Sequence, residues 1–515
     1  MSRRSHACRA MLLILGLGFF LTSHATNSVA IPRNVPGYAG LFALKSCQAH
    51  LPAAASANPI QTDSDLIIVE APVVLPGTLS RRFPKGSRLA RRAPSAQASR
   101  SLTPDFFAAA DPRISFDGAR ALFSGKKTAD SLWQIWEMNA DGTGARQITH
   151  CASDCMQPAY LAHGLIVYTT IFNSSPAHAT RSIGEGSQIW TSKLDGTDAQ
   201  PITFGPGDFQ VETVLQNGTI LLTARTPLLP SNGHPADREL YTIRLDGTAL
   251  ATLRCDHQHP AIRSQAEELD DGSVVFVKAL LNNQSVAGQL AWIRRGAVHN
   301  EPLAPPSIQV MSPQPIAGNE VIVSHETAIG TGSGTKLALY SFDAESGKFS
   351  SPLFQDPKLS AVEAVPLAAH ESPRWYWSTL NADLKRGYFI CLNGYLAQDA
   401  PQGKIAAKLA RVRVLTLDAA TQHESLLGEA PMEEDGSFYI AVPPDKPVRF
   451  EVLDAAGSMV RAQKSWIWAR SGEEHGCVGC HEDRALAPEN RWPMALRRFD
   501  TPTRLDLANH VDGSK

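Results

Sequence analysis

A pattern that recurs roughly every 50 residues through the middle of the chain constrains the fold more than any other feature. A glycine followed by a short apolar, β-rich run occurs five times, at spacings of 46, 54, 54 and 46 residues. The five glycines are Gly118, Gly164, Gly218, Gly272 and Gly318. Because a glycine turn before such a run is typical of the start of a β-strand, this region is expected to repeat one β unit.

A second recurring element identifies the kind of unit. Residues 134–143, 188–197 and 239–248 each alternate apolar and polar positions and end in Asp-Gly-Thr. Alternation predicts a half-buried strand, and an Asp-Gly pair favours a tight hairpin. Several short strands per repeat are the signature of a propeller blade, whereas a β-sandwich with chance Asp-Gly turns is the alternative. We therefore predict an all-β fold with a six-bladed (five to seven) β-propeller over residues 103–395, its last blade completed by residues 66–71.

The segments on either side of the propeller have a different composition. Residues 31–102 are interpreted as an N-terminal extension, whose part 81–100 carries seven basic and no acidic residues among Pro, Ser and Ala. This composition predicts a solvated linker, with docking on an acidic partner or anionic lipid as the alternative. Residues 400–470 alternate as half-buried strands, which predicts a small antiparallel, sandwich-like β module. Residues 471–515 form the segment with the cysteine motif and the tail.

The N-terminus predicts export. Arg3, Arg4 and Arg9 precede an apolar run at residues 11–21, and cleavage sites of small residues follow up to residue 30. An uncleaved anchor is the alternative, but the run is short for crossing a bilayer. We expect a periplasmic or secreted protein without a stable membrane span. The formal net charge of −2 gives no basic field that would favour nucleic acid.

The most informative short motif is Cys477-Val-Gly-Cys480-His481, the pattern of c-type haem attachment. Two thiols three positions apart can bond to the two vinyl groups of one haem, and His481 can then bind the iron. A zinc site would need further ligands, for which only His475 is near, and a redox disulfide would prefer a βαβ context. The motif therefore predicts one covalent haem c.

The sixth iron ligand stays open between several candidates. Met494 lies downstream of the motif, and a thioether ligand would raise the reduction potential toward electron-transfer values. His475 and His423 are alternatives, and an open position would permit small-molecule chemistry.

Other candidate residues lie in the propeller. Cys151 and Cys155 are predicted to form a disulfide, with metal binding beside His150 or Asp154, or contact with the haem edge, as alternatives. Cys391 has no partner at short spacing. Some propeller histidines could face a central channel, although histidines more often lie in loops or the core. They are His163, His234, His257, His259 and His325.

The chain also resembles known families. Its Asp-Gly-Thr units resemble TolB-like propellers, and residues 105–118, 150–155, 433–439 and 477–482 are similar to the hydrazine synthase alpha-subunit family. The similarity extends over about residues 103–500 and implies a propeller joined to a middle domain with a c-type haem. The family, as generally described, holds the catalytic iron through a tyrosine shortly after the motif and carries a second haem domain. Here residues 482–493 contain no tyrosine, and no second C-x-x-C-H occurs.

These features predict an exported mono-haem c-type cytochrome, with electron transfer as its role and the propeller as a docking or substrate-binding platform. A haem-dependent oxidoreductase acting on a small nitrogen or oxygen species is the first alternative, and a non-catalytic propeller binding module is the second. The expected partner is a redox protein or a small-molecule substrate.

Overall fold

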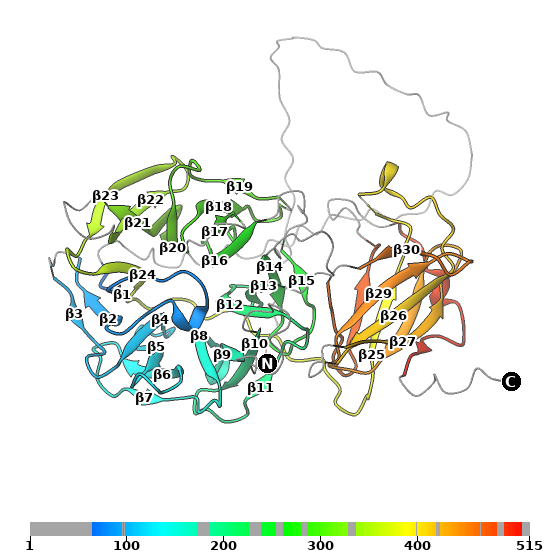
Figure 1. Cartoon of the computed structure of the whole chain (residues 1–515), viewed down its shortest axis with the longest axis horizontal. Helices are drawn as coiled ribbons and strands as arrows, with labels where there is room; N and C mark the ends of the chain where they lie inside the picture. Colours follow the sequence, from blue (N-terminus) through cyan, green and yellow to red (C-terminus); the bar gives the residue numbers. More distant parts are fainter. Residues whose placement is uncertain are drawn as a thin grey trace, which may run out of the picture. The chain divides into compact units, whose positions relative to one another are not determined.

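The computed structural model is built almost entirely from β-strands (Figure 1). Its helical elements are short 3-10 turns: η1 (Leu79–Arg81), η2 (Ala162–Gly164), η4 (Pro401–Gly403) and η5 (Met494–Leu496). None of the helices in the described part has the length and apolarity that crossing a membrane requires. The described residues are 64–94, 96, 98–172, 186–225, 238–253, 261–280, 286–297, 299–327, 336–397, 399–418, 423–463, 465–480 and 489–506. The predicted signal segment, residues 1–30, lies outside them.

The described strands from residue 66 to residue 366 fall into six four-stranded antiparallel units around a common centre (Figure 1). The inner strands of successive units contact one another in order, and the last contacts the first. A single parallel bridge between β10 and β12 joins two units into one sheet. This arrangement confirms the all-β propeller. The strands of the units, from the inner strand outward, are β24 (Ser360–Pro366), β1 (Leu66–Ala71), β2 (Arg88–Arg92) and β3 (Arg100–Ser101); β4 (Ala108–Ile114), β5 (Arg120–Lys126), β6 (Gln134–Asn139) and β7 (Arg146–Gln147); β8 (Asp154–Leu161), β9 (Leu165–Phe172), β10 (Gly186–Lys193) and β11 (Gln200–Pro201); β12 (Asp208–Val214), β13 (Ile220–Arg225), β14 (Glu239–Ile243) and β15 (Ala251–Thr252); β16 (Ile262–Glu268), β17 (Val274–Ala279), β18 (Gln289–Ile293) and β19 (Glu301–Pro302); β20 (Val310–Ala317), β21 (Glu320–Thr327), β22 (Lys336–Asp343) and β23 (Lys348–Phe354).

The Asp-Gly-Thr turns connect the two outer strands of three units. In the first, Asp141 Oδ1 accepts hydrogen bonds from the Thr143 backbone N–H and hydroxyl, at 2.9 and 2.6 Å. Asp195–Thr197 and Asp246–Thr248 repeat this arrangement. Each central glycine has a positive φ, as such turns require. The local sequence therefore specifies each hairpin independently of the rest of the fold.

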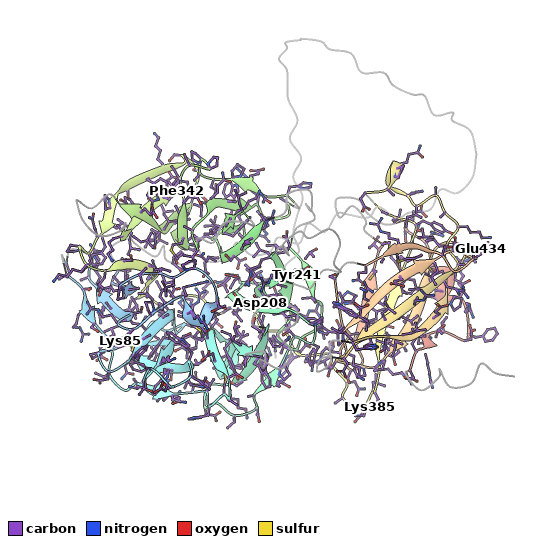
Figure 2. All side chains as sticks on the ribbon, viewed as in Figure 1. Lys85, Asp208, Tyr241, Phe342, Lys385 and Glu434 are labelled. Carbon is purple, nitrogen blue, oxygen red and sulfur yellow. A yellow bond between two sulfur atoms is a disulfide. The ribbon has the colours of Figure 1, made fainter. Side chains whose placement is uncertain are left out.

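The ring closes through residues from the two ends of the propeller. β24 pairs antiparallel with β1, with Val69 opposite Val362, so the predicted contribution of residues 66–71 to the last blade is confirmed. Both side chains are fully buried. Phe342 on β22 of the neighbouring unit, labelled in Figure 2, is also fully buried. The apolar faces of the units thus pack around the whole ring.

The basic segment 81–100 is not a solvated linker, which corrects the interpretation of residues 31–102. Its residues 88–92 form β2, which pairs with β1. Arg88 donates to the buried carboxylate of Glu70 at 2.8 Å, and Arg91 donates to Asp65 at 2.5 Å. Because acidic partners some 20 residues earlier neutralise these arginines, the charge run is compatible with a strand inside the sheet.

The second β region starts earlier than the sequence indicated. β25 (Gly387–Cys391), which we assigned to the propeller, belongs to the following module. One of its sheets has the order β31-β25-β28-β32, with β28 (Phe438–Val442), β31 (Glu474–Cys477) and β32 (Thr503–Arg504). The other has the order β27-β26-β29-β30, with β26 (Arg411–Leu417), β27 (Glu424–Pro431), β29 (Val448–Leu453) and β30 (Met459–Ala462). β31 and β32 add in parallel, because long connections return them to the sheet.

Specific contacts tie the module to the propeller within one compact unit, residues 56–515. Trp468, 1% exposed, donates its indole N–H to the Gly247 carbonyl oxygen at 3.1 Å. Its ring meets Phe204 and Phe209 edge-on. The connector between propeller and module also bonds to two propeller turns, through His370 N–H to Phe116 and Arg374 N–H to Gln216. Burial of a large aromatic side chain at this junction fixes where the strand with the cysteine motif begins.

Candidate haem-attachment site

The cysteine motif continues from β31, and that strand pairs in parallel with β25. The register places His475 opposite Phe389 and Cys477 opposite Cys391. Beyond the strand, the backbone of the motif remains hydrogen bonded to the segment that follows β25. Leu392 N–H donates to the Cys477 carbonyl oxygen, and Cys480 N–H donates to that of Leu396, both at 2.9 Å. The two cysteines are thus held at fixed positions on the edge of a sheet.

The surroundings of the two cysteines combine an apolar base with access from solvent. Cys477 and Cys480 are half-buried and pack against the buried core of the module, which includes Phe389, Leu409 and Phe438. A fully buried thiol could not react with a large planar group, and a fully exposed one would not hold that group against apolar side chains. Their placement therefore fits covalent attachment of a porphyrin edge.

A surface hollow of about 280 Å³ lies next to the motif. Its walls come from the segment after β25, from Val478 of the motif and from the tail. The lining residues are Leu392, Asn393, Leu396, Val478, Glu489, Arg491 and Pro493. The fold thus brings the tail back to the motif, although residues 481–488, including His481, lie outside the described part.

Asp435 anchors the tail at this hollow. Its carboxylate accepts from the Met494 backbone N–H at 2.9 Å and lies 3.3 Å from Arg491. Burial opposes ionisation, but hydrogen bonds from Ser437 and Met494, together with the charge of Arg491, hold the pKa of Asp435 below its ordinary value. An ionised Asp435 therefore fixes the start of η5. Glu434, labelled in Figure 2, immediately precedes it in the chain.

The structure separates the three candidates for the sixth ligand. Met494 follows the lining residue Pro493 directly and is half-buried. The His475 ring instead packs on Phe389, with ring centroids 5.3 Å apart, and its Nδ1 lies 3.7 Å from Glu473. His423 is exposed in the loop between β26 and β27. That loop is at the far end of β26, about 20 Å along the strand from the end near the motif. Only Met494 adjoins the hollow.

Cys151 and Cys155 form a disulfide with a Cα–Cα distance of 6.5 Å. They lie at the start of β8 in the propeller. Asp154 is not directed at a metal there, because its Oδ1 accepts from the Trp133 backbone N–H at 2.8 Å. His150 Nδ1 is 3.1 Å from Gln147 Nε2. Among the described residues, no group of three or more His, Cys, Asp or Glu is arranged to hold a metal ion.

The described propeller histidines do not line the central channel. His163 packs against Trp375 at a centroid distance of 4.7 Å, and the His325 ring lies 5.8 Å from that of Tyr340. His234, His257 and His259 lie outside the described residues. The channel is lined instead by acidic and amide side chains in the middle of the inner strands. The sequence analysis missed them, although Asp, Gln or Glu recurs there at nearly the spacing of the strand-start glycines.

Comparison with known proteins agrees with the resemblance seen in the sequence. Residues 394–482 match the family model described as the hydrazine synthase alpha subunit middle domain, and this stretch includes both cysteines of the motif. The chain is 22% identical to hydrazine synthase subunit alpha of Kuenenia stuttgartiensis, over 85% of this chain and 70% of that protein. The resemblance to the hydrazine synthase alpha-subunit family is thereby confirmed.

The solved structure of Kuenenia stuttgartiensis hydrazine synthase has a similar fold. Its TM-score with this chain is 0.73 at 19% identity, covering 86% of this chain and 72% of the matched one. A TolB structure from Agrobacterium tumefaciens matches with a TM-score of 0.38 and 12% identity, over 61% of this chain and 94% of that one. The first comparison shows that propeller and module recur together in a solved protein.

Proposed function

We propose that this chain is an exported c-type haem protein of the hydrazine synthase alpha-subunit type, in which the haem acts on a small nitrogen or oxygen species. The observation that carries the proposal is the position of Cys477 and Cys480. They lie half-buried on a sheet edge, inside the stretch similar to the hydrazine synthase middle domain. The protein would then be a haem-dependent oxidoreductase of the periplasm or the cell exterior.

The described residues fit such a group. Cys477 and Cys480 would hold the porphyrin through thioether bonds, and His481 would be the proximal iron ligand. The apolar core beneath the cysteines would exclude water from one side of the ring. When bound, the haem supplies a redox-active iron, while the sheet edge and Asp435 keep the motif and the tail in place. The predicted signal at residues 1–30 supports the proposal, because it would carry the chain to a disulfide-permitting compartment.

The comparisons favour an enzymatic role over simple electron transfer. The similar proteins carry the name of an enzyme, hydrazine synthase, and one of them is a subunit of it. We extend this to the present chain as a proposal, with a redox protein or further subunits as partners. Electron transfer remains the second candidate because Met494 adjoins the hollow beside the motif, where a thioether ligand would close the iron.

Covalent haem attachment is tested with the full chain, exported by a host that matures c-type cytochromes. We expect a haem-stained band on a denaturing gel and an intact mass increased by one haem. The double variant Cys477→Ala/Cys480→Ala should lose both signals, because no thioether can form. Cys391→Ala, which removes the cysteine opposite Cys477 in the register, is the matched control and should keep them. An unmodified mass of the exported wild-type chain would contradict the haem proposal.

The two roles are separated by ligand binding to the reduced haem. An iron with an open position should bind carbon monoxide rapidly and shift its absorption spectrum, as expected for an enzyme acting on a small molecule. If Met494 closes the iron, carbon monoxide should bind slowly or not at all, and Met494→Ala should restore rapid binding. Leu496→Ala, two positions along the same 3-10 turn, serves as the control. A closed iron in the wild type would reject the enzymatic role in favour of electron transfer.

A further inference from the structure

The central channel of the propeller has an unusual backbone. Five inner strands each place one residue other than glycine in the left-handed region, with φ between 50° and 55°. These residues are Asp111, Gln157, Gln265, Ser312 and Glu363. In the sixth inner strand, β12, the register shifts around Glu212. Because side chains with a Cβ rarely adopt this conformation, its repetition in five of the six units calls for a stabilising contact.

Hydrogen bonds between neighbouring units supply that contact. The Glu363 carboxylate accepts from Asp111 N–H at 2.8 Å, and the Asp111 carboxylate accepts from Gln157 N–H at 3.1 Å. Farther around the ring, Glu212 accepts from Ala266 N–H at 3.0 Å, and the Gln265 carboxamide oxygen accepts from Ser312 N–H at 2.6 Å. Each of these side chains is thus held at the channel wall by the backbone of the next unit.

The charges on the wall form two opposed groups. Asp111 and Glu363 come from adjacent units, and so do Glu212 and Glu267. One intervening unit on each side, with Gln157 and Ser312 respectively, separates the two pairs. The channel therefore presents one carboxyl pair on each of two opposite arcs.

Each carboxyl pair already has one guanidinium partner. Arg113 reaches across the channel and donates to Glu267 at 2.6 Å and to the Glu212 carbonyl oxygen at 2.5 Å. Arg82 lies 4.0 Å from Glu363. With all groups ionised, each arc keeps one more carboxylate than guanidinium. The wall would therefore accept one further positive charge on each arc.

The space between the arcs suits an organic ligand. The hollow has a volume of about 550 Å³, and Pro112, Val211, Pro313 and Val365 contribute apolar surface to its wall. No His, Cys, Asp or Glu cluster of the kind that holds a metal ion occurs among the described residues. A ligand that matches this wall has a positive group at each end and an apolar middle.

We propose that the propeller channel binds a short aliphatic diamine, with one ammonium group at the Asp111–Glu363 pair and the other at the Glu212–Glu267 pair. The methylene chain would lie along the proline and valine side chains. Carboxylates are suitable acceptors for ammonium N–H groups in a partly desolvated site. This binding does not depend on the haem and adds a second function to the chain.

The site is expected to bind better at high pH. Burial raises the pKa of Glu212 to about 7, against hydrogen bonds from Ala266 and Thr223 and the charges of Arg238 and Arg82. Burial also raises the pKa of Glu363 to about 8, with a further increase from Asp111 that Arg82 and Arg113 oppose. Arg113 and Glu267 face Glu212 from the other units. Because ammonium groups need ionised carboxylates, affinity should fall as the pH drops from 9 to 6.

The test is a calorimetric titration of the exported full chain with 1,4-diaminobutane at pH 9 and pH 6. We expect saturable binding at pH 9 that is at least tenfold tighter than binding of 1-aminobutane and at least tenfold tighter than at pH 6. Glu212→Gln and Glu363→Gln should each weaken binding at least tenfold, because the amide keeps the acceptor oxygen and loses the charge. Glu345→Gln, in an exposed hairpin turn, is the matched control and should bind like the wild type.

Three results would overturn the proposal. They are the absence of saturable heat with folded wild-type chain, equal affinity for the diamine and the monoamine, and unchanged affinity in both carboxyl variants. Circular dichroism establishes that each variant is folded. Because the two carboxyls lie in different units, one variant still tests the site if the other does not fold.

Discussion

Glu212 and Glu363 show how single residues combine structural and electrostatic roles. Each accepts a backbone N–H from a neighbouring unit, and so connects two units at the channel wall. Each also keeps its carboxyl where burial raises the pKa above the ordinary value. A side chain that joins two units thus makes the fold sensitive to pH.

This sensitivity predicts the direction in which stability changes with pH. A carboxyl whose pKa is higher in the folded than in the unfolded chain stabilises the fold below pH about 4.5, and this contribution is lost as the pH rises through about 7 and 8. The double variant Glu212→Gln/Glu363→Gln should therefore lose less stability than the wild type between pH 5 and pH 9. We expect a difference on the order of 2–4 kcal/mol, measured by urea unfolding.

The control for this measurement is Glu345→Gln, which should follow the wild type across the same range. A wild-type stability that rises from pH 5 to pH 9 relative to the double variant would contradict the raised pKa values.

At the level of elements, the Asp-Gly-Thr hairpins use glycine for two separate reasons. Every one of these glycines has a positive φ, which the turn requires. Gly196 also lies so close to the preceding unit that a Cβ would overlap the carbonyl oxygen of Ile148. Gly164, at φ 70°, has no atom within 4 Å of that position. The hairpin of Gly196 is therefore part of the packing between two blades.

These two glycines allow turn strain and blade packing to be measured separately. Gly164→Ala should cost about 1–2 kcal/mol, because only the left-handed backbone opposes it. Gly196→Ala should cost a further 1–3 kcal/mol or so, because the Ile148 backbone must move. Thermal unfolding followed by circular dichroism gives both values. Equal losses in the two variants would show that the neighbouring blade yields without cost.

At the level of the whole molecule, the propeller depends on a pairing between strands almost 300 residues apart. β1 and β24 close the ring, with Val69 opposite both Val362 and Leu89. The disulfide, the turns and the channel bonds all act within or between adjacent units. Only this closing sheet joins the two ends of the propeller.

A charge inserted in the closing sheet should therefore destabilise the whole ring. Val69 is fully buried, and Val69→Asp should cost more than about 4 kcal/mol because the new carboxylate has no partner there. Val73, 46% exposed just after β1, provides the matched control, and Val73→Asp should change stability by less than about 0.5 kcal/mol. Thermal unfolding and limited proteolysis would report both. A stable, protease-resistant Val69→Asp chain would mean that the ring does not depend on its closing sheet.

Local chemistry explains what could be predicted from the sequence. The glycine repeats, the alternating runs and the Asp-Gly-Thr turns act over a few residues, so they indicated the propeller directly. The spacing of Cys477 and Cys480 likewise determines which group they suit. The resemblance to the hydrazine synthase family rested on such short segments too, and the comparisons confirmed it.

Contacts between distant residues were decided only by the tertiary structure. The arginines at 88 and 91 looked like part of a linker until Glu70 and Asp65 were found opposite them. β25 looked like a propeller strand until its pairing with β28 and β31 placed it beside the motif. The carboxyl pairs of the channel come from four different units. A sequence records which charges and apolar faces a segment carries, but only the folded ring determines which distant segment faces them.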